Sequence, residues 1–311
     1  MQTAQPWSDF DQHPADPARD GRIAAGGSKR GPVRAGPARG RPPLGKYLSE
    51  LWSRRHLTWE FAKSRFRAQN EANRLGMGWV VLNPLIQAGV YGLVFGLIMP
   101  NSSRPENYPA FLVVGVFTFS FFSGCFADGA KSLISNRGMV RALHFPRAVL
   151  PLATVLQKMF ELVAMVAVMA IIVMFTGETP DLDWLMIIPA YALMALFCGG
   201  VAFLAARLTV HMRDITQLIP FITRLFFYMS GIFFIIGERF KDRAFGPLLE
   251  LNPLNVYISL IRYSMLEGLR GVENGIEITA TTWALAGGYG VLLFVVGFLF
   301  FWQAEGLYGR D

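Results

Sequence analysis

Two ionisable residues, Lys158 and Glu161, stand three positions apart within a long apolar run. Positions i and i+3 lie on one face of a helix, so the ammonium and the carboxylate can pair. An ionisable group inside a membrane is costly and normally faces a cavity or an opposite charge. The spacing therefore favours a self-neutralised structural pair. The alternative is a proton relay, for which Glu161 is the only carboxylate in the predicted spans.

A further cation, Arg224, lies in the run FITRLFFYM with no acidic residue within one helical turn. It needs a water-filled cavity, an acid from another helix or an anionic substrate. Aromatic residues crowd this run and an earlier one. Most of them are expected to face lipid or pack between helices, but rings that line a conduit would suit the C–H faces of sugars.

Motifs for enzymatic chemistry are absent from the sequence. There is no G-x-x-x-x-G-K-[ST], H-E-x-x-H, C-x-x-C or G-x-S-x-G pattern. The four histidines do not cluster, which argues against a metal site. The chain is therefore not predicted to be an enzyme, and energy for any pumping must come from a partner chain or an ion gradient.

The composition places these residues in a membrane protein. The 311-residue chain is 53% apolar and only 16% charged, whereas soluble domains carry about 25% charged residues. Its mean hydropathy is +0.36. These values exclude a disordered chain and a disulfide-stapled secreted domain, and they predict an all-α polytopic membrane protein.

About 20 apolar residues cross a bilayer as a helix. The sequence predicts six such spans, namely Met77–Met99, Tyr108–Ala127, Ala148–Thr176, Trp184–Arg207, Gln217–Ile236 and Thr281–Trp302. Between the last two, Phe245–Leu269 is apolar but is broken by Gly246, Pro247, Asn252 and Pro253. We expect two short half-helices here that dip into the membrane and return, covered by protein or a water-filled cavity. This re-entrant hairpin is a candidate gate.

The residues before the first span divide into two parts. Residues 1–44 are rich in Pro, Gly, Ala and Arg and are predicted to be a disordered cytoplasmic tail. Residues 45–76 contain an amphipathic helix over 46–70, in which Trp52, Trp59 and Phe66 recur every seven residues. Trp on a basic helix suits the headgroup region of a membrane, and an ordinary cytosolic helix is the alternative. Residues 77–311 then form the transmembrane domain.

Basic residues in the short loops give the orientation. The loop after the second span holds Lys131, Arg137, Arg141 and Arg147, whereas the loop after the third holds Glu178, Asp181 and Asp183. Both termini are therefore predicted to be cytoplasmic. The net charge of +7 resides in the first 76 residues, which hold 14 Lys and Arg against seven Asp and Glu. The basic tail of residues 1–44 could touch anionic lipid or nucleic acid, but a solvated tail that obeys the positive-inside rule is favoured.

The order of three motifs resembles a known family. They are G-W-x-x-L-x-P at Gly78–Pro84, the basic loop that ends in Phe145–Pro146–Arg147, and Asn252–Pro253 with Arg262 downstream. Over residues 46–311 the chain is similar to the permease subunits of type-2 ABC exporters of lipid-linked polysaccharide, such as the O-antigen, teichoic acid and galactan exporters.

The resemblance implies a channel made of two copies of this chain, with two separate nucleotide-binding subunits that hold the ATP and Mg, so that the chain itself needs no cofactor. It assigns residues to four places. The ATPase-coupling segment would contain Lys131, Leu133, Ile134, Arg137, Met139 and Arg141. The lipid-headgroup site would contain Trp52, Trp59, Arg65, Arg67 and Arg74. The channel would contain Tyr91, Arg224, Phe227 and Tyr228, and the gate hairpin Pro247, Asn252, Pro253, Tyr257 and Arg262.

The partners expected on this basis are the nucleotide-binding subunit, a second copy of the chain, a lipid-pyrophosphate-linked glycan and membrane lipids, with no nucleic acid. The tail composition hints at a high-GC source, so a cell-wall galactan is the first expectation for the cargo. An ABC-2 permease for a drug or a small lipid, a secondary carrier and a membrane scaffold remain as alternatives.

Overall fold

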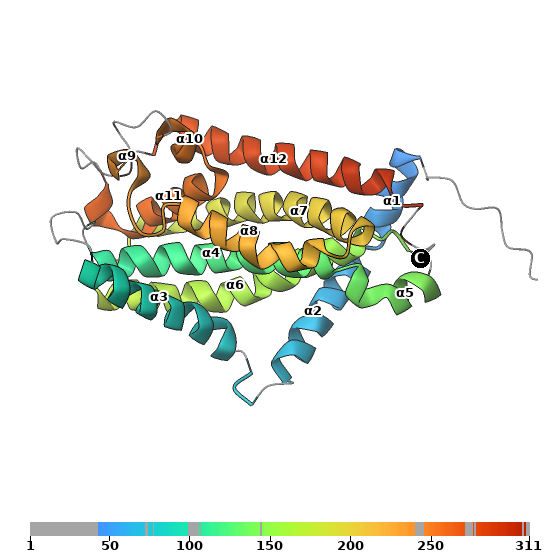
Figure 1. The fold of residues 1–311 in the computed structure, drawn as a ribbon, viewed down its shortest axis with the longest axis horizontal. Coiled ribbons are helices and arrows are strands. Elements are labelled where there is room, and N and C mark those ends of the chain that lie inside the picture. Colours follow the sequence, from blue (N-terminus) through green and yellow to red (C-terminus); the bar gives the residue numbers. More distant parts are fainter. Residues whose placement is uncertain are drawn as a thin grey trace, which may run out of the picture. The chain divides into compact units, whose positions relative to one another are not determined.

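The computed structural model describes residues 43–71, 74–76, 78–98, 105, 107–143, 145–239, 246–270, 276, 278–306 and 308. Every regular element within these ranges is a helix, as the composition predicts (Figure 1). The predicted tail, except its last two residues, lies outside the described residues, and so does Phe245 at the start of the predicted hairpin.

Four helical segments are long and apolar enough to cross a membrane. They are α4 (Tyr108–Lys131), α6 (Val149–Phe175), the segment Leu182–His211 made of η3 (Leu182–Met186) and α7 (Ile187–His211), and α12 (Ala280–Gln303). They match the second, third, fourth and sixth predicted spans. Two shorter apolar stretches are Gly78–Val94 of α3 (Gly78–Ile98) and α8 (Ile215–Met229). The count of six spans therefore stays a prediction.

Helix α4 is the centre of the core. In the most apolar stretch of α4, 72% of the residues are buried, whereas the corresponding share in α12 is 28%. The difference arises because α4 packs on α3, α6, α7, α8 and α11 (Pro253–Met265). The phenylalanines that crowd this helix, among them Phe111, Phe117 and Phe121, are almost fully buried. This run of aromatic side chains is therefore mainly packing material between helices.

Helices α7 and α12 share the most extensive contact in the fold, and glycines make it possible (Figure 1). A Cβ atom on Gly200 would lie 2.3 Å from the carbonyl carbon and oxygen of Leu293, and one on Gly297 would lie 2.4 Å from the carbonyl oxygen of Gly200. Next to this contact the Phe203 ring packs on Phe298 with 5.5 Å between centroids. The two backbones approach each other so closely that no side chain fits between them.

The fifth predicted span ends earlier than expected. The sequence predicts it to Ile236, whereas α8 ends at Met229 and a turn leads to the short α9 (Ile236–Arg239). Gly231 has a φ of 68°, which glycine adopts without strain. The Ser230 hydroxyl donates to the carbonyl of Phe227 at 3.0 Å. These local contacts end the helix within a stretch that hydropathy alone reads as continuous.

The interrupted segment forms two short helices, α10 (Gly246–Glu250) and α11, as predicted. Asn252 begins α11, since its side-chain oxygen accepts from the Leu254 amide at 3.1 Å and its amide donates to the Met229 carbonyl at 3.1 Å. Pro253 occupies the first turn, where no amide donor is needed. Whether this pair of helices re-enters the membrane stays a prediction.

The prediction of a single amphipathic helix over residues 46–70 is wrong in one respect. It is two helices, α1 (Leu44–Ser53) and α2 (Arg55–Glu71), which are separated at Arg54. The two helices are held by different contacts. The α1 residue Tyr47 is buried, while α2 packs on α6, where Trp59 and Phe66 contact the Phe160 ring at 5.0 and 5.9 Å. Trp52, on the other side of the break, is 72% exposed.

Candidate functional site

A cavity of about 700 Å³ lies among α3, α4, α6 and α8, and residues at the C-terminal end of α2 contribute to it. Its wall combines three kinds of side chain. Amides and hydroxyls come from Gln69, Asn83, Gln87, Ser120, Ser123 and Thr223, rings from Trp79, Tyr91, Phe119, Phe121 and Phe227, and charges from Lys158, Glu161 and Arg224. Polar groups among aromatic rings are typical of sites that bind a ligand with both polar and apolar faces.

Three of the four predicted channel residues meet in this cavity. Tyr91 on α3 and Phe227 on α8 pack with 5.0 Å between ring centroids, and Arg224 lies one turn before Phe227. Tyr228 is not part of the lining and is half exposed, with its ring stacked on Phe233 at 5.9 Å. The shared location is a finding, while a role in conduction stays a prediction.

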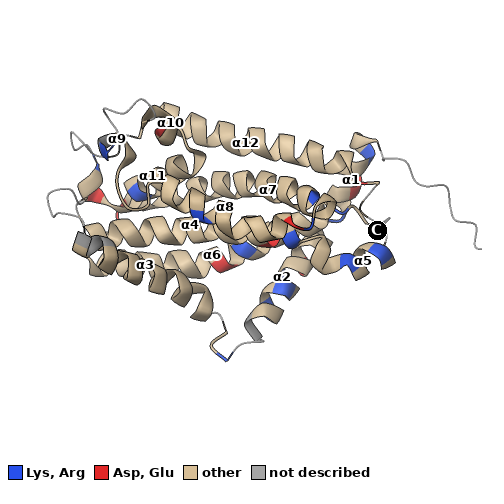
Figure 2. Ribbon diagram, in the orientation of Figure 1, with Lys and Arg blue, Asp and Glu red and all other residues tan. Residues whose placement is uncertain are grey.

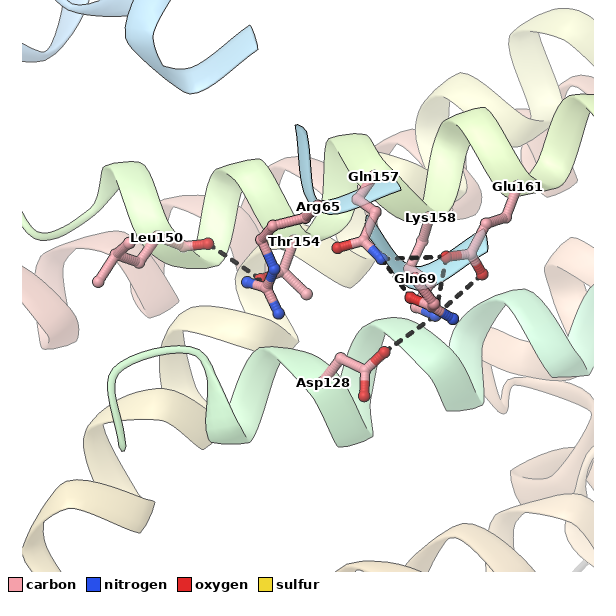
Figure 3. A network of polar contacts seen from close by, with 8 residues as sticks. All are labelled: Arg65, Gln69, Asp128, Leu150, Thr154, Gln157, Lys158 and Glu161. Atoms are coloured by element: carbon pink, nitrogen blue, oxygen red, sulfur yellow. Dashed lines mark hydrogen bonds and ion pairs between the residues drawn. The ribbon is translucent and has the colours of Figure 1, made fainter. Parts of the chain in front are cut away.

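The predicted pair of Lys158 and Glu161 is present, and it has a third member (Figure 3). The Lys158 ammonium lies 2.9 Å from Oε2 of Glu161 and 2.9 Å from Oδ2 of Asp128, which comes from α4. Sequence reasoning missed Asp128 because it placed the end of the second span at Ala127, whereas α4 continues to Lys131. The cluster therefore joins α4 to α6 beside the cavity.

Polar contacts also tie α2 to α6 near this cluster (Figure 3). The Gln157 amide donates to Oε1 of Gln69 at 2.6 Å and to Oε1 of Glu161 at 3.2 Å. Closer to the start of α6, the Arg65 guanidinium donates to the Thr154 hydroxyl at 3.1 Å. The end of α2 is thus connected through amides to the charged cluster.

The predicted headgroup residues occupy different surroundings. Arg65 is partly buried against α6, and this burial lowers the pKa of its guanidinium from the usual value. Trp59 packs on Phe160 but is still 48% exposed, and Trp52, Arg67 and Arg74 are exposed as well. The structure therefore leaves Arg67 and Arg74 as the exposed cations of this set.

In the predicted gate hairpin, Arg262 is only 2% exposed. Its guanidinium donates to three main-chain carbonyls, those of Phe111 at 3.1 Å, Gly231 at 2.7 Å and Ile232 at 2.8 Å. It also stacks 3.4 Å from the centroid of the Phe111 ring. Among the described residues no carboxylate pairs with it, so Arg262 connects α11 to α4 and to the turn after α8 through hydrogen bonds to main-chain carbonyls and the contact with the Phe111 ring.

A further hydrogen bond attaches the hairpin to α12. The Tyr257 hydroxyl donates to the Ala286 carbonyl of α12 at 2.7 Å. Beyond the hairpin, Arg270 forms an ion pair with Asp183 at 2.8 Å and a hydrogen bond with Asp181, which lowers the pKa of the Asp181 carboxyl. Pro247, by contrast, is exposed.

The predicted coupling segment folds as η2 (Ile134–Asn136) and α5 (Arg137–Ala142). Lys131 and Arg141 are exposed, while Ile134, Arg137 and Met139 are half-buried. Figure 2 shows basic residues on α5. Leu133 is buried with Val140 against Leu150 and Phe203, so its side chain anchors the segment rather than facing outward.

A buried hydrogen-bond node joins both ends of the described chain to the loop after α5. The carboxylate of Glu305 accepts from the Tyr47 hydroxyl at 2.9 Å and from the Arg147 amide at 3.0 Å. The Arg147 guanidinium donates to the carbonyl of Glu305, and the Ala148 amide donates to the Tyr47 oxygen at 3.2 Å. Burial raises the pKa of the Glu305 carboxyl above its usual range, against these donors. Sequence reasoning missed this node because its members are separated by about the whole length of the domain.

Replacing Tyr47 by phenylalanine is expected to lower the free energy of unfolding by about 2 kcal/mol, because Glu305 loses a charge-assisted hydrogen bond and the Ala148 amide loses its acceptor. Thermal unfolding of the purified chain in detergent measures this. The control is Tyr263→Phe, whose hydroxyl has no hydrogen bond within the described residues. Equal stability of both variants would show that the node does not contribute to the free energy of unfolding.

Comparison with known proteins covers most of these elements. The profile of the ABC-2 type transporter family matches residues 56–266, from α2 to the end of α11. The chain is 28% identical over 236 residues to the O-antigen export system permease protein RfbA of Klebsiella pneumoniae, a match that covers 76% of this chain and 86% of that protein. It is 26% identical over 214 residues to the polysialic acid transport protein KpsM of Escherichia coli, covering 66% and 78% of the two chains.

A third relative is the O-antigen export system permease protein RfbA of Myxococcus xanthus, which is 25% identical over 211 residues, or 67% of this chain and 80% of that protein. The family match covers more than half of the chain and includes the cavity, the charged cluster, the coupling segment and Arg262. This chain is therefore a member of the ABC-2 type transporter family.

Proposed function

We propose that this chain is the channel-forming subunit of an ATP-driven exporter that moves a lipid-linked polysaccharide from the cytoplasmic to the outer side of a bacterial inner membrane. The observation that carries the proposal is the cavity among α3, α4, α6 and α8, whose amides, hydroxyls and rings suit sugars and whose Arg224 suits phosphate. The relatives named for O-antigen export and polysialic acid transport support a polysaccharide as the cargo.

The energy source is a separate nucleotide-binding subunit, present in two copies, that binds ATP and Mg. Two copies of this chain form the membrane channel. The basic segment from Lys131 to Arg141 is the contact with the ATPase, because its short helix α5 carries exposed or half-exposed cations beside a buried anchor at Leu133. With this segment on the cytoplasmic side, both termini lie in the cytoplasm as well. Helices α3 and α8 complete a set of six spans.

Transport begins with the pyrophosphate head of the lipid. The exposed cations Arg67 and Arg74 attract it at the cytoplasmic surface, next to the α2 end that borders the cavity. ATP binding in the partner subunits moves the coupling segments, and the hairpin of α10 and α11 opens as the gate. The glycan passes between the two copies, and a cell-wall galactan is the cargo we expect first.

The proposal is tested by purifying the chain from its native membrane in mild detergent with whatever subunit accompanies it. We expect a stoichiometric partner with nucleotide-binding motifs and a measurable ATPase activity. Changing Arg137 and Arg141 together to glutamate is expected to reduce glycan-dependent ATPase activity about tenfold or more, because reversed charges oppose docking.

The matched control is Arg213→Glu, which reverses an exposed charge in the loop between α7 and α8 and is expected to keep the activity. A homo-oligomer that co-purifies with no ATPase would contradict the proposal. So would an active complex in which the double charge reversal changes nothing.

A further inference from the structure

We propose that only half of the gate hairpin moves when the exporter opens. The moving half is residues 246–251, which are α10 and the following Leu251, and the fixed half is α11 with η4 (Glu267–Leu269). This inference rests on the proposed function, in which the hairpin is the gate, and assigns the movement within it. The two halves differ in how firmly they are attached to the rest of the chain.

Helix α11 is part of the buried core. Nine of its 13 residues are buried, Arg262 among them. The Tyr257 hydroxyl donates to the Ala286 carbonyl of α12 at 2.7 Å and lies 3.4 Å from the Leu193 carbonyl of α7. Because the Arg262 guanidinium also bonds to α4, this one helix makes polar contacts with three others. A movement of α11 would leave these buried groups without partners, which is costly in a low-dielectric interior.

The far end of the fixed half is attached as well. The carboxylate of Glu178, in the loop between α6 and η3, accepts from the Glu267 amide at 2.9 Å and from the Asn107 side-chain amide at 2.8 Å. Arg270 forms an ion pair with Asp183 of η3 at 2.8 Å. Residues 267–270 are therefore bound to the segment between α6 and α7, which is itself bonded to the start of α4.

Helix α10, by contrast, contributes little to the core. Of its residues only Gly246, which has no side chain, is buried. Leu248 is 73% exposed and Leu251 is 47% exposed. Neither leucine belongs to the clusters of buried apolar side chains that include α11 and its neighbours. Apolar packing therefore holds α11 much more firmly than α10.

Two side chains bond to the C-terminal end of α10, and both bonds lie at the surface. The Asn255 amide donates to the Glu250 carbonyl at 3.0 Å, and the Tyr289 hydroxyl donates to the Leu251 carbonyl at 2.8 Å. Water can replace a donor at an exposed carbonyl, so breaking these bonds costs less than breaking those within the core. Segments with few buried contacts and exposed hydrogen bonds open at low free energy.

The boundary between the two halves is Asn252. Its side chain accepts from the Leu254 amide at 3.1 Å and donates to the Met229 carbonyl at 3.1 Å, so it belongs to the fixed half. Pro253 restricts the backbone in the first turn of α11. Rotation about the backbone bonds of Leu251 can therefore move α10 while α11 stays in place, since hinges are often residues at the ends of helices.

The test pins each half separately, in the complete exporter complex reconstituted in proteoliposomes. The moving half is pinned by Gly237→Cys with Glu250→Cys, which links α10 to α9. These positions are neighbours, because a Cβ atom on Gly237 would lie 3.0 Å from Oε1 of Glu250. Helix α9 is on the fixed side, since Ile236 is only 3% exposed.

The fixed half is pinned by Glu178→Cys with Glu267→Cys, which replaces the hydrogen bond at η4 by a covalent link. A short, reducible bis-thiosulfonate reagent closes the link in each double variant by joining the two thiols through disulfides. The native residues Cys125 and Cys198 are buried and therefore protected from the reagent.

The probe is a polyprenyl-diphosphate-linked galactan, whose ATP-driven export is measured before cross-linking, after it and after reduction. We expect the link between α9 and α10 to lower export about tenfold or more, reversibly, because a gate that cannot move blocks release. The link at η4 should leave export within about twofold of its starting rate. Each double variant thus serves as its own control.

Hydrogen exchange of the unmodified complex is a second measurement that needs no substitution. Exchange is compared without nucleotide and during ATP hydrolysis in the presence of the galactan. We expect the exchange rate to change at least about threefold more in residues 246–251 than in residues 253–265.

The outcomes separate the inference from the proposed function. Export that survives the link between α9 and α10, or that the link at η4 abolishes, overturns the inference and leaves the exporter function standing. Equal changes of exchange in the two stretches overturn it as well. An unmodified complex that does not export the galactan contradicts the proposed function, and the inference with it.

Discussion

Replacing Arg262 by methionine is expected to lower the free energy of unfolding by about 3 kcal/mol, because the carbonyls of Gly231 and Ile232 then lose a buried donor. Methionine keeps much of the apolar stem, so the loss reports the hydrogen bonds more than a cavity. The effect is local as well as global, since the guanidinium bonds to the main chain of α4 and of the turn after α8.

Thermal unfolding in detergent measures the first effect, and hydrogen exchange over residues 230–236 and 253–265 measures the second. We expect exchange in both stretches to become faster, because the hydrogen bonds that Arg262 donates to this turn are lost and local opening costs less free energy. Arg239→Met is the control, because it removes an exposed cation from the nearby α9. Unchanged exchange in the Arg262 variant would mean that the hairpin is held by its apolar contacts alone.

The same contact can be disturbed from the opposite side. A Cβ atom on Gly115 of α4 would lie 2.5 Å from Nη2 of Arg262, so Gly115→Ala must displace the guanidinium. The hydrogen exchange of this variant should therefore change in the same two stretches, even though Arg262 itself is intact.

A second large loss is expected when alanine replaces Gly200. The new methyl group would lie 2.3 Å from the Leu293 backbone, and a backbone cannot move aside as a flexible side chain does. Helices α7 and α12 must move apart at this position, so we expect the free energy of unfolding to fall by about 3 kcal/mol. Gly297→Ala, from the other helix, should behave alike because its Cβ would meet the Gly200 carbonyl oxygen.

Gly288→Ala supplies the matched control on α12. Nothing lies within 4 Å of its added Cβ atom, and alanine is the better helix former, so its stability should rise by up to about 1 kcal/mol. The apparent melting temperatures of the three variants, measured in one detergent, give the comparison. Similar melting temperatures for Gly200→Ala and Gly288→Ala would contradict the close approach of the two backbones.

The sequence predicts best what depends on neighbours along one helix. The pair of Lys158 and Glu161 follows from its spacing, and the break at Asn252 and Pro253 follows from what these residues do at helix starts. Long apolar runs likewise predict α4, α6, α7 and α12 to within a few residues, because the membrane requires continuous apolar length.

Contacts between distant segments could not be predicted from the sequence, for a physical reason. Arg262 binds main-chain carbonyls, which every residue carries, so no residue type marks its partners. Asp128 enters the charged cluster only because α4 is one turn longer than its apolar run. The prediction that Trp52 and Trp59 share one face required a continuous helix. The contacts that hold α1 and α2 on either side of Arg54 depend on tertiary packing, which the sequence does not show.

The node of Tyr47, Arg147 and Glu305 has a consequence for how the protein is made. Its first and last members are 258 positions apart, so the acceptor of Tyr47 is synthesised long after α1 itself. At ribosomal rates of 5–20 residues per second the wait is roughly 10–50 s. During synthesis the Tyr47 hydroxyl therefore lacks its Glu305 acceptor until the last helix has been made, and a chain that ends before Glu305 cannot complete the node.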